Sequence, residues 1–269
     1  MHEILRNLDP GAIVLDLGSG SNGSVDPAHY PGLRIIRLDN QFPMLPCSDG
    51  FVQGDGALLP FRNRSFDAVI ANHCLEHIDD LTSALTEIGR VLRANGSLYA
   101  SVPDASTLTD HIYQWIFAGG GHVNGFRSGS ELEERITAST GMKPVASRVL
   151  YTSLIFLGRH RYYPRPPRRV RLFGNGNLTF IAWLTYALRR FDQLFGTRTS
   201  VYGWAFYFGA ISEPIETAPW TNVCVNCGTG HSSASLEANN QIGRTSMAMP
   251  FYLCPACRCW NLFTQDRRY

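Results

Sequence analysis

The sequence predicts an α/β protein built on a parallel sheet, followed by a small module of a different kind. Short apolar segments that alternate with candidate helices predict the sheet, because this alternation is typical of parallel sheets covered on both faces. Two Cys-x-x-Cys pairs predict the second module. With 269 residues, 44% of them hydrophobic, the chain is long enough to form both parts. We expect strands at 13–17, 34–38, 50–53, 67–71 and 97–102.

The first expected strand, 13–17, runs into a glycine turn. Asp16 precedes this turn, and Gly18 and Gly20 lie within it. Because glycine has no β-carbon, a ligand can approach the backbone closely, and the N–H groups of the turn can face its polar atoms. The turn therefore predicts a ligand-binding loop.

Carboxylates follow the next two strands. Asp39, followed by Asn40, ends the second strand, where a carboxylate is suited to binding two ribose hydroxyls. Asp55, followed by Gly56, comes just after the third strand, where an adenine amino group could donate to it. Together with the glycine turn, these residues predict a nucleoside-binding site.

The clearest helix is expected at 79–93. Asp79 or Asp80 can cap its start, and Asn95–Gly96 should supply the turn that ends it. Its apolar residues recur at helical spacing on one face: Leu81, Ala84, Leu85, Ile88, Val91 and Leu92.

The helices on either side of the second strand are expected to be short or missing. Pro27 and Pro31 leave room for only a short helix before that strand, and Pro43 and Pro46 indicate that the helix after it is reduced or missing. Further helices are expected at 106–118 and 128–138.

The order of the motifs resembles that of the class I, Rossmann-like S-adenosylmethionine-dependent methyltransferases, in particular the group that acts on small molecules. The resemblance covers 10–157 and returns at 203–212. It implies a seven-stranded sheet, S-adenosylmethionine as cofactor, and methyl transfer to an oxygen or nitrogen atom. The motifs that carry it are Val14–Gly20, Arg37–Asn40, Gly54–Phe61, Phe66–Asp79 and Leu92–Pro103.

The resemblance also implies roles for individual residues. His73 and His122 are candidate general bases, and His77 is expected to orient its loop through its ring. The implied cofactor contacts are Asp16 and the backbone of Gly18 and Gly20 for the methionine portion, Asp39 with Asn40 for the ribose, Asp55 with Gly56 for the adenine, and the Asn72 backbone for the amino-acid end.

A dinucleotide site is the rival interpretation of the glycine turn. Gly18, Gly20 and Gly23 also match the dinucleotide spacing, with Asp39 at a suitable distance downstream. A pyrophosphate, however, is best bound by a helix that begins at the turn, and the prolines leave little room for one. The Asp16 carboxylate would also repel it. We therefore favour the methyltransferase interpretation over a nicotinamide enzyme or a degenerate fold without ligand.

An insertion is expected between the last two strands of the sheet. A sixth strand is predicted at 144–157 and a seventh, antiparallel to its neighbours, at 201–211. The family joins these strands by a short hairpin, whereas 158–202 intervenes here and is expected to select the substrate. The net charge of the chain is only +2, yet eleven basic residues and no acidic ones lie between Glu134 and Asp192.

The function of this basic, aromatic insertion stays open at this point. It could bind an anionic acceptor with an apolar part, such as a lipid-linked or nucleotide-linked sugar. It could bind nucleic acid through Arg159–Arg171. The alternative to a binding role is packing, either in a small core or in a homodimer contact. Peripheral contact with anionic lipid would use Phe180, Ile181, Trp183, Leu184 and Leu188.

The cysteine module is expected to be a structural zinc ribbon spanning 216–269, after a methyltransferase domain at 1–215. Two Cys-x-x-Cys turns that face each other give tetrahedral coordination by four thiolates, and an iron–sulfur centre is the minority alternative. Cys259 could stand in as a ligand, whereas Cys47 and Cys74 are expected to be ordinary buried thiols. The predicted zinc ligands are Cys224, Cys227, Cys254 and Cys257.

We expect a cytoplasmic protein, because no segment approaches the roughly 20 apolar residues of a transmembrane helix and the N-terminus lacks the pattern of a signal peptide. The favoured function is methyl transfer to a small or lipid-linked acceptor. The alternatives are an RNA methyltransferase that docks through the insertion and the ribbon, and a non-catalytic scaffold.

Overall fold

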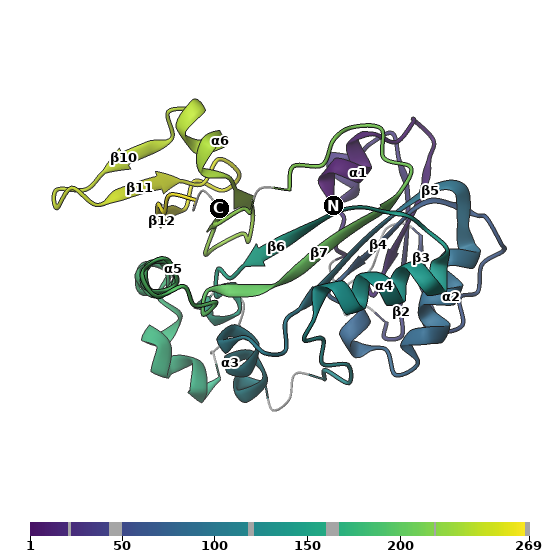
Figure 1. Cartoon of the computed structure of the whole chain (residues 1–269), viewed down its shortest axis with the longest axis horizontal. Helices are drawn as coiled ribbons and strands as arrows, with labels where there is room; N and C mark the ends of the chain where they lie inside the picture. Colours follow the sequence, from purple (N-terminus) through teal and green to yellow (C-terminus); the bar gives the residue numbers. More distant parts are fainter. Residues whose placement is uncertain (21–22, 43–49, 118–120, 160–166, 218, 267–269) are drawn as a thin grey trace. The chain divides into compact units, whose positions relative to one another are not determined.

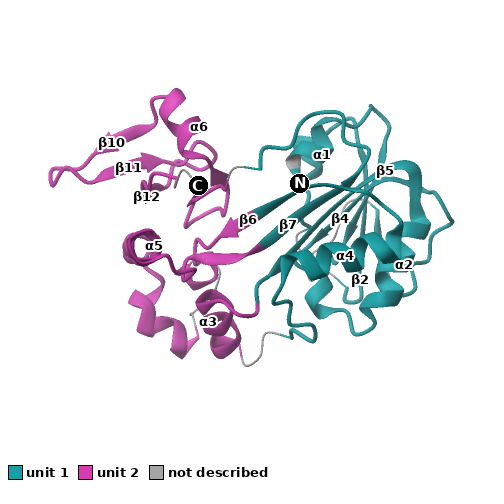
Figure 2. Cartoon of the chain, viewed as in Figure 1, with its two compact units in different colours: residues 1–104, 121–148, 204–217 teal, residues 105–120, 149–203, 218–269 magenta. Residues whose placement is uncertain are grey.

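The computed structural model describes residues 1–20, 23–42, 50–117, 121–159, 167–217 and 219–266 (Figure 1). The chain divides into two compact units (Figure 2). Unit 1 comprises 1–104, 121–148 and 204–217, and unit 2 comprises 105–120, 149–203 and 218–269. Unit 2 thus groups most of the insertion with the cysteine module. The domain boundary between 215 and 216 stays a prediction.

A seven-stranded sheet, built mainly from unit 1, confirms the predicted α/β fold. The strand order is β3-β2-β1-β4-β5-β7-β6, and β1 pairs parallel with β2 and β4, β2 with β3, and β4 with β5. The strands are β1 (Ile13–Leu17), β2 (Arg34–Asp39), β3 (Phe51–Gln53), β4 (Phe66–Asn72), β5 (Leu92–Pro103), β6 (Pro144–Tyr151) and β7 (Val201–Gly209).

The central strands form because their apolar runs can be buried on both faces, as parallel sheets require. Val14 to Leu17 of β1 and Ala68 to Ala71 of β4 are fully buried. The helices α2 (Leu81–Val91) and α4 (Gly129–Thr140) pack against each other beside the sheet (Figure 1). The Asp80 side chain caps α2 by accepting from the Ser83 N–H at 3.0 Å.

Among the described residues before the second strand the helices are short, as its flanking prolines predict. The N-terminal α1 (His2–Arg6) is five residues long, and η1 (Pro27–His29) is a single 3-10 turn between β1 and β2. The predicted reduction of the helix after β2, with Pro43, Pro46 and Cys47, lies outside the described residues.

The end of α2 corrects the sequence prediction. The helix stops at Val91, before the expected Asn95–Gly96 turn, because Leu92 adopts an extended conformation and pairs with Phe66 of β4. The pairing then jumps to Ala68 with Ser97, so Asn95–Gly96 lies in an irregular part of β5 rather than in a helix-ending turn.

The sixth strand is shorter than predicted. It ends at Tyr151, because the Thr152 hydroxyl accepts from the Leu154 N–H at 3.0 Å and Leu154 turns into a left-handed conformation at φ +50°. The 3-10 helix η3 (Ile155–Leu157) follows. Along the chain, β6 leads from unit 1 into unit 2 and β7 leads back, so the two strands run in opposite directions (Figure 2).

Unit 2 contains α3 (Leu108–Ile116), η3, η5 (Arg168–Gly176) and α5 (Leu178–Phe195). The helix α5 is capped by the Asn177 side chain, which accepts from two backbone N–H groups, and it ends at Gly196 in the left-handed conformation. No helix among the described residues is both long enough and apolar enough to cross a membrane.

The cysteine module adds two small sheets to unit 2. The two-stranded sheet pairs β8 (Asn222–Val223) with β9 (Gly230–His231), and α6 (Ser233–Ala238) follows it. The three-stranded antiparallel sheet contains β10 (Ile242–Arg244), β11 (Pro250–Leu253) and β12 (Trp260–Leu262).

Replacing Asp192 by Ala should destabilise unit 2 by about 3 kcal/mol, because its buried carboxylate accepts several hydrogen bonds from the turn at 197–200. Burial raises the pKa of Asp192, but these hydrogen bonds outweigh burial and lower it. Its contribution is therefore present above the usual aspartate pKa and is lost as the pH falls through the lowered value. Urea unfolding against pH measures both effects. The exposed Glu237→Ala is the control, and equal loss in both variants would contradict the prediction.

Candidate active site and cysteine cluster

The strand order reverses between β1 and β4, the two strands that lie side by side at the centre of the sheet. In open parallel sheets, ligands bind at the carboxyl ends of the strands at such a reversal. The glycine turn follows β1 at this edge, Asn72 ends β4, and His73 comes next. The fold therefore brings the predicted nucleoside-binding residues and the candidate base His73 to one edge.

Asp16 anchors the glycine loop from the end of β1. Its side chain is fully buried, and its Oδ2 accepts from the N–H groups of Ser24 and Val25 at 2.7 and 3.2 Å. Burial raises the pKa of this carboxyl. Within the described residues its Oδ1 has no hydrogen-bond partner, which is costly for a buried carboxylate oxygen. A cationic or hydrogen-bonding group at this point would remove that cost.

The glycines of the loop are required by its conformation. Gly18 and Gly20 have φ of +65° and +57°, in the left-handed region. A β-carbon on Gly18 would lie 2.3 Å from Cβ of Cys74, whereas one on Gly20 would meet no atom within 4 Å. Cys74 is itself buried, as predicted. The loop is therefore tightly packed at Gly18 and open at Gly20.

Asp39 connects the second strand to the glycine loop. Its Oδ2 accepts from the Gly20 N–H at 2.8 Å and its Oδ1 from the Gln41 N–H at 2.9 Å. The neighbouring Asn40 is exposed, and its carbonyl oxygen accepts from the Gln53 side chain. The half-buried Asp39 carboxylate is thus held in one orientation, with lone pairs left for a diol.

Asp55 follows the adjacent strand β3 and is exposed. Its Oδ1 accepts from the Ala57 N–H at 2.9 Å, which shapes the turn after the strand. Gly56 is buried, and a β-carbon there would lie 2.9 Å from the Ile78 side chain. Because β3 and β2 are neighbours, Asp55 and Asp39 follow adjacent strands of the sheet.

Asn72 and His73 are both fixed by Ser101 of β5. The Ser101 hydroxyl donates to the Asn72 side chain at 2.8 Å, and the His73 N–H donates to the Ser101 carbonyl oxygen at 3.0 Å. His73 has φ +53°, a strained conformation for a residue with a side chain. Burial, together with His122 and His77, lowers the pKa of His73 to about 4, so its ring is neutral at neutral pH.

A second segment approaches the turn η2 (Leu75–His77) that follows His73. The Nδ1 atom of His77 hydrogen-bonds to the Gly121 carbonyl oxygen at 2.9 Å, and the rings of His77 and His122 lie edge to face at 5.0 Å. His122 thus lies beside the turn that follows β4. The sequence analysis did not single out Glu76, which lies close to both His77 and His122, although it stands inside the same Leu-Glu-His triplet as His77. It also did not single out Asn124, whose side chain donates to the carbonyl oxygens of Leu75 and Ile78.

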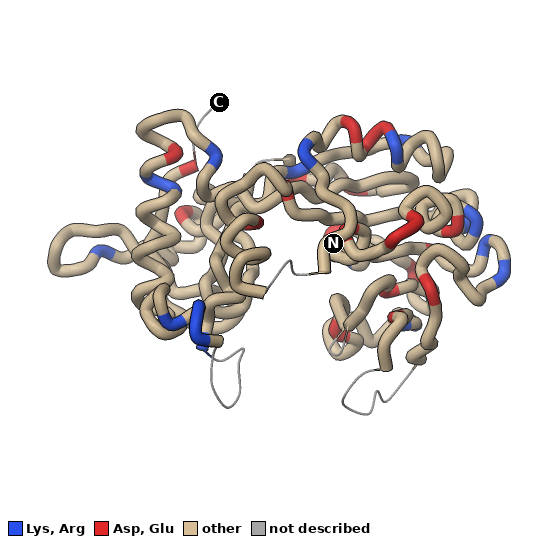
Figure 3. The backbone as a smooth tube through the Cα atoms, turned by 90° about the horizontal axis from the view of Figure 1, so that it is seen from below, with Lys and Arg blue, Asp and Glu red and all other residues tan. Residues whose placement is uncertain are grey.

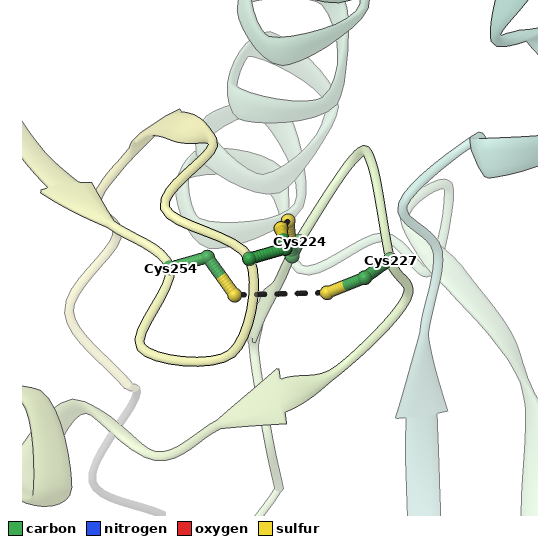
Figure 4. A group of neighbouring side chains, drawn as sticks. Cys224, Cys227 and Cys254 are labelled. Carbon is green, nitrogen blue, oxygen red and sulfur yellow. Dashed lines mark hydrogen bonds between the residues drawn. The ribbon is translucent and has the colours of Figure 1, made fainter. Parts of the chain in front are cut away.

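The four predicted zinc ligands come together in unit 2. Their Sγ atoms all lie within 4.8 Å of one another, with 3.6 Å between those of Cys224 and Cys257. The Sγ atoms of Cys227 and Cys254 are also 3.6 Å apart, and Figure 4 shows these two side chains pointing toward each other. A hydrogen bond involving Cys224 lowers the pKa of the Cys227 thiol below its usual value. Cys259 does not belong to this group. The sequence prediction missed His231, whose Nε2 lies 3.5 Å from the Cys254 Sγ.

The basic residues between Glu134 and Asp192 differ in their exposure to solvent. Arg148 is buried and donates to the Glu216 carbonyl oxygen, and Arg189 is buried and donates to the carbonyl oxygens of Thr152 and Val223. Arg169 stacks on the Trp115 ring at 5.0 Å. Arg159, Arg168 and Arg171 are exposed, among the basic residues coloured blue in Figure 3, and Arg161 and Arg165 lie outside the described residues.

The predicted lipid-facing residues of α5 divide between the surface and the interior of unit 2. Ile181 is fully buried, and Leu184 and Leu188 pack against the same apolar core. Phe180 and Trp183 are exposed, at 45% and 38%. The helix therefore packs onto its unit along one side and leaves Phe180 and Trp183 accessible, together with Phe191 and Phe195 near its end.

Comparison with known proteins supports a methyltransferase domain at this sheet edge. Residues 15–100 match the family described as a methyltransferase domain. The chain is 35% identical over 95 residues to a demethylmenaquinone methyltransferase from Renibacterium salmoninarum, covering 33% of this chain and 40% of that protein. It is 31% identical over 147 residues to a malonyl-[acyl-carrier protein] O-methyltransferase from Methylococcus capsulatus, covering 50% of this chain and 54% of that protein. The chain thus spans about half the length of these relatives.

Among solved structures, a SAM-dependent methyltransferase from Archaeoglobus fulgidus is 16% identical, with a TM-score of 0.49, and the alignment covers 76% of this chain and 89% of that one. The matched residues 15–100 include the glycine loop, both carboxylates at the strand ends and the start of the histidine cluster. Residues 15–100 are therefore similar to a methyltransferase domain.

Proposed function

We propose that this chain transfers a methyl group from S-adenosylmethionine to an oxygen or nitrogen atom of a small, lipid-linked or nucleotide-linked acceptor. The observation that carries the proposal is the hydrogen bond from the Gly20 N–H to Asp39, which joins the glycine loop to the carboxylate that ends β2. This arrangement lies at the strand reversal, where parallel sheets bind their ligands.

The residues at this edge fit S-adenosylmethionine. The buried Oδ1 of Asp16, which has no partner among the described residues, suits an ammonium group reached directly or through water. Gly18 and Gly20 keep the backbone free of side chains, and Asp39 with Asn40 suits the ribose diol. Asp55 and Gly56 suit the adenine, and the Asn72 backbone suits the amino-acid end. When bound, the cofactor supplies an electrophilic methyl group.

The chain contributes alignment and a proton acceptor to this reaction. In-line substitution is accelerated chiefly by holding the nucleophile and the methyl group in position. His73 is neutral at neutral pH and sits at the end of β4, so it can accept a proton from an acceptor hydroxyl or amine, although its low pKa makes it a weak base. His122, which lies beside His77, is the second candidate base.

The acceptor is proposed to be anionic with an apolar part. Exposed Arg168 and Arg171 in η5 suit phosphate oxygens, and exposed Phe180 and Trp183 at the start of α5 suit an apolar group. All four belong to unit 2. The named relatives act on demethylmenaquinone and on malonyl-[acyl-carrier protein], so proteins similar to this chain serve acceptors of different chemistry.

We also propose that Cys224, Cys227, Cys254 and Cys257 bind a structural zinc ion. Tetrahedral zinc with Zn–S bonds of about 2.3 Å places its sulfur ligands about 3.8 Å apart. The two 3.6 Å separations in the cluster agree with that value. Cys259, outside the group of four, is expected not to bind the ion.

Methyl transfer from S-adenosylmethionine with a labelled methyl group tests the proposed function. The full-length protein is incubated with lipid, small-molecule and RNA fractions, and label is counted in each. We expect label in the lipid or small-molecule fraction and much less of it with Asp39→Ala. Label confined to RNA would favour docking of nucleic acid on the exposed arginines. No transfer to any fraction by a folded protein would favour a non-catalytic scaffold.

A further inference from the structure

We infer that Glu76, His77 and His122 form a second metal site, which binds a divalent transition-metal ion beside the carboxyl end of β4. The site is separate from the four cysteines, because its three residues belong to unit 1 and the cysteines belong to unit 2. It lies next to His73, the candidate base, in the turn that follows the strand.

The donor atoms of the three side chains already lie close together. One ligand atom of each residue is within 4.8 Å of those of the other two. Ligands bound at about 2.1 Å lie about 3–4 Å apart, so a small approach of the exposed His77 ring completes the site. Two imidazoles and one carboxylate suit divalent first-row transition metals and leave coordination positions open for water or substrate oxygen.

The hydrogen bond of His77 prepares the ring for coordination. Its Nδ1 faces the Gly121 carbonyl oxygen at 2.9 Å, an acceptor that requires the proton on Nδ1 and leaves the lone pair on Nε2. Metal-binding histidines characteristically donate their other ring N–H to a carbonyl or carboxylate, which fixes the tautomer and the ring orientation. The His122 ring lies edge to face with the His77 ring.

The two segments that supply the ligands are joined before any ion binds. The N–H groups of Val123 and Asn124 donate to the Glu76 carbonyl oxygen at 2.9 and 3.0 Å. The Asn124 side chain donates to the carbonyl oxygens of Leu75 and Ile78 at 3.1 and 2.7 Å. These four hydrogen bonds hold His122 beside the turn, so ion binding loses little entropy in ordering the loop.

The burial of Glu76 favours a cation at this place. The residue is only 1% exposed, and its Oε1 lies 3.8 Å from the Nδ1 atom of His73. Weak dielectric screening at a buried position strengthens the attraction between this carboxylate and a divalent cation. His77, the last residue of the turn, is exposed to solvent, which gives the ion a route of entry.

The ion has a role in catalysis if the proposed methyl transfer is correct. A Lewis acid beside the acceptor lowers the pKa of a coordinated hydroxyl, which makes oxygen a better nucleophile at neutral pH. In that case His122 is a metal ligand rather than the base, and His73 remains the base candidate. Metal binding itself does not depend on the methyl transfer.

Equilibrium dialysis of the zinc-loaded, full-length protein against Mn²⁺, and separately against Co²⁺, tests the site. We expect one further ion per chain with at least one of these metals. His77→Ala and His122→Ala should each weaken its binding at least tenfold, and His29→Ala, an exposed histidine of unit 1, should not. Circular dichroism of each variant checks that the fold is kept.

Two outcomes would overturn the inference: no ion bound beyond the zinc, or a further ion whose affinity is unchanged in both histidine variants. A parallel titration with S-adenosylhomocysteine separates this inference from the proposed function. Asp39→Ala should weaken S-adenosylhomocysteine binding at least tenfold and keep the ion. An ion bound by a wild-type protein that does not bind S-adenosylhomocysteine would support the metal site alone.

Discussion

Chelating the zinc ion proposed at the four cysteines should unfold much of unit 2, including α5, and not only the cysteine module. Structural zinc sites contribute about 10–16 kcal/mol of apparent binding free energy to the folds that they hold. Val225, between the first two cysteines, belongs to the same apolar core as Leu157 and Ile181. Arg189 of α5 donates to the carbonyl oxygen of Val223, which directly precedes Cys224. Hydrogen exchange with and without chelator measures the loss of protection in α5.

Cysteine variants provide the control for this prediction. Cys257→Ser should abolish stoichiometric zinc binding and deprotect α5, whereas Cys259→Ser, outside the group of four, should keep the metal and the protection. Amides of α5 that stay protected after complete chelation would show that the cysteine module and the insertion fold independently. Retained zinc in Cys257→Ser would contradict the assigned ligand set.

Replacing Gly18 by Ala should destabilise unit 1 by about 3 kcal/mol, because two costs combine at this position. The left-handed φ of +65° disfavours any side chain by about 1–2 kcal/mol, and overpacking a tight site costs about 1–3 kcal/mol more. The new methyl group would lie 2.3 Å from Cβ of Cys74, so the loop or the turn must shift. Urea unfolding followed by circular dichroism measures the loss.

Gly20→Ala is the matched control for Gly18→Ala. It has a similar φ of +57°, but its β-carbon would meet no atom within 4 Å, so we expect a loss of only about 1 kcal/mol. Its methyl group would project into the space proposed for the cofactor, and binding of S-adenosylhomocysteine should weaken. Equal destabilisation by the two substitutions would contradict the packing difference between these glycines.

The residues at the carboxyl ends of the strands could be predicted from the sequence because each is marked by a pattern of neighbouring residues. Asp16, Asp39 and Asp55 each stand at or just after a short apolar run, and the glycine turn follows one of these runs directly. Parallel strands place such positions at one edge, so local patterns were enough to predict that these residues gather there.

The histidine cluster, the exposure of the arginines and the end of α2 depend on contacts between segments that are distant in the sequence. Local sequence patterns do not encode such contacts. His77 and Gly121 are 44 residues apart, and only the folded chain brings His122 to the turn after β4. Counting charges likewise could not distinguish the exposed Arg168 from Arg189, whose guanidinium is buried against backbone carbonyl groups. The end of α2 was misplaced because the pairing of Leu92 with Phe66 overrides the turn preference of Asn95–Gly96.

Calorimetric titration with S-adenosylhomocysteine, on the wild type and on Asp39→Ala, tests most directly whether the edge of the sheet binds the cofactor. We expect micromolar binding by the wild type and at least a tenfold loss in the variant, a difference of about 1.4 kcal/mol. Asp39 also accepts the Gly20 N–H, so circular dichroism must show that the variant is folded. No binding by a folded wild-type protein, or equal binding by both, would contradict the proposed site.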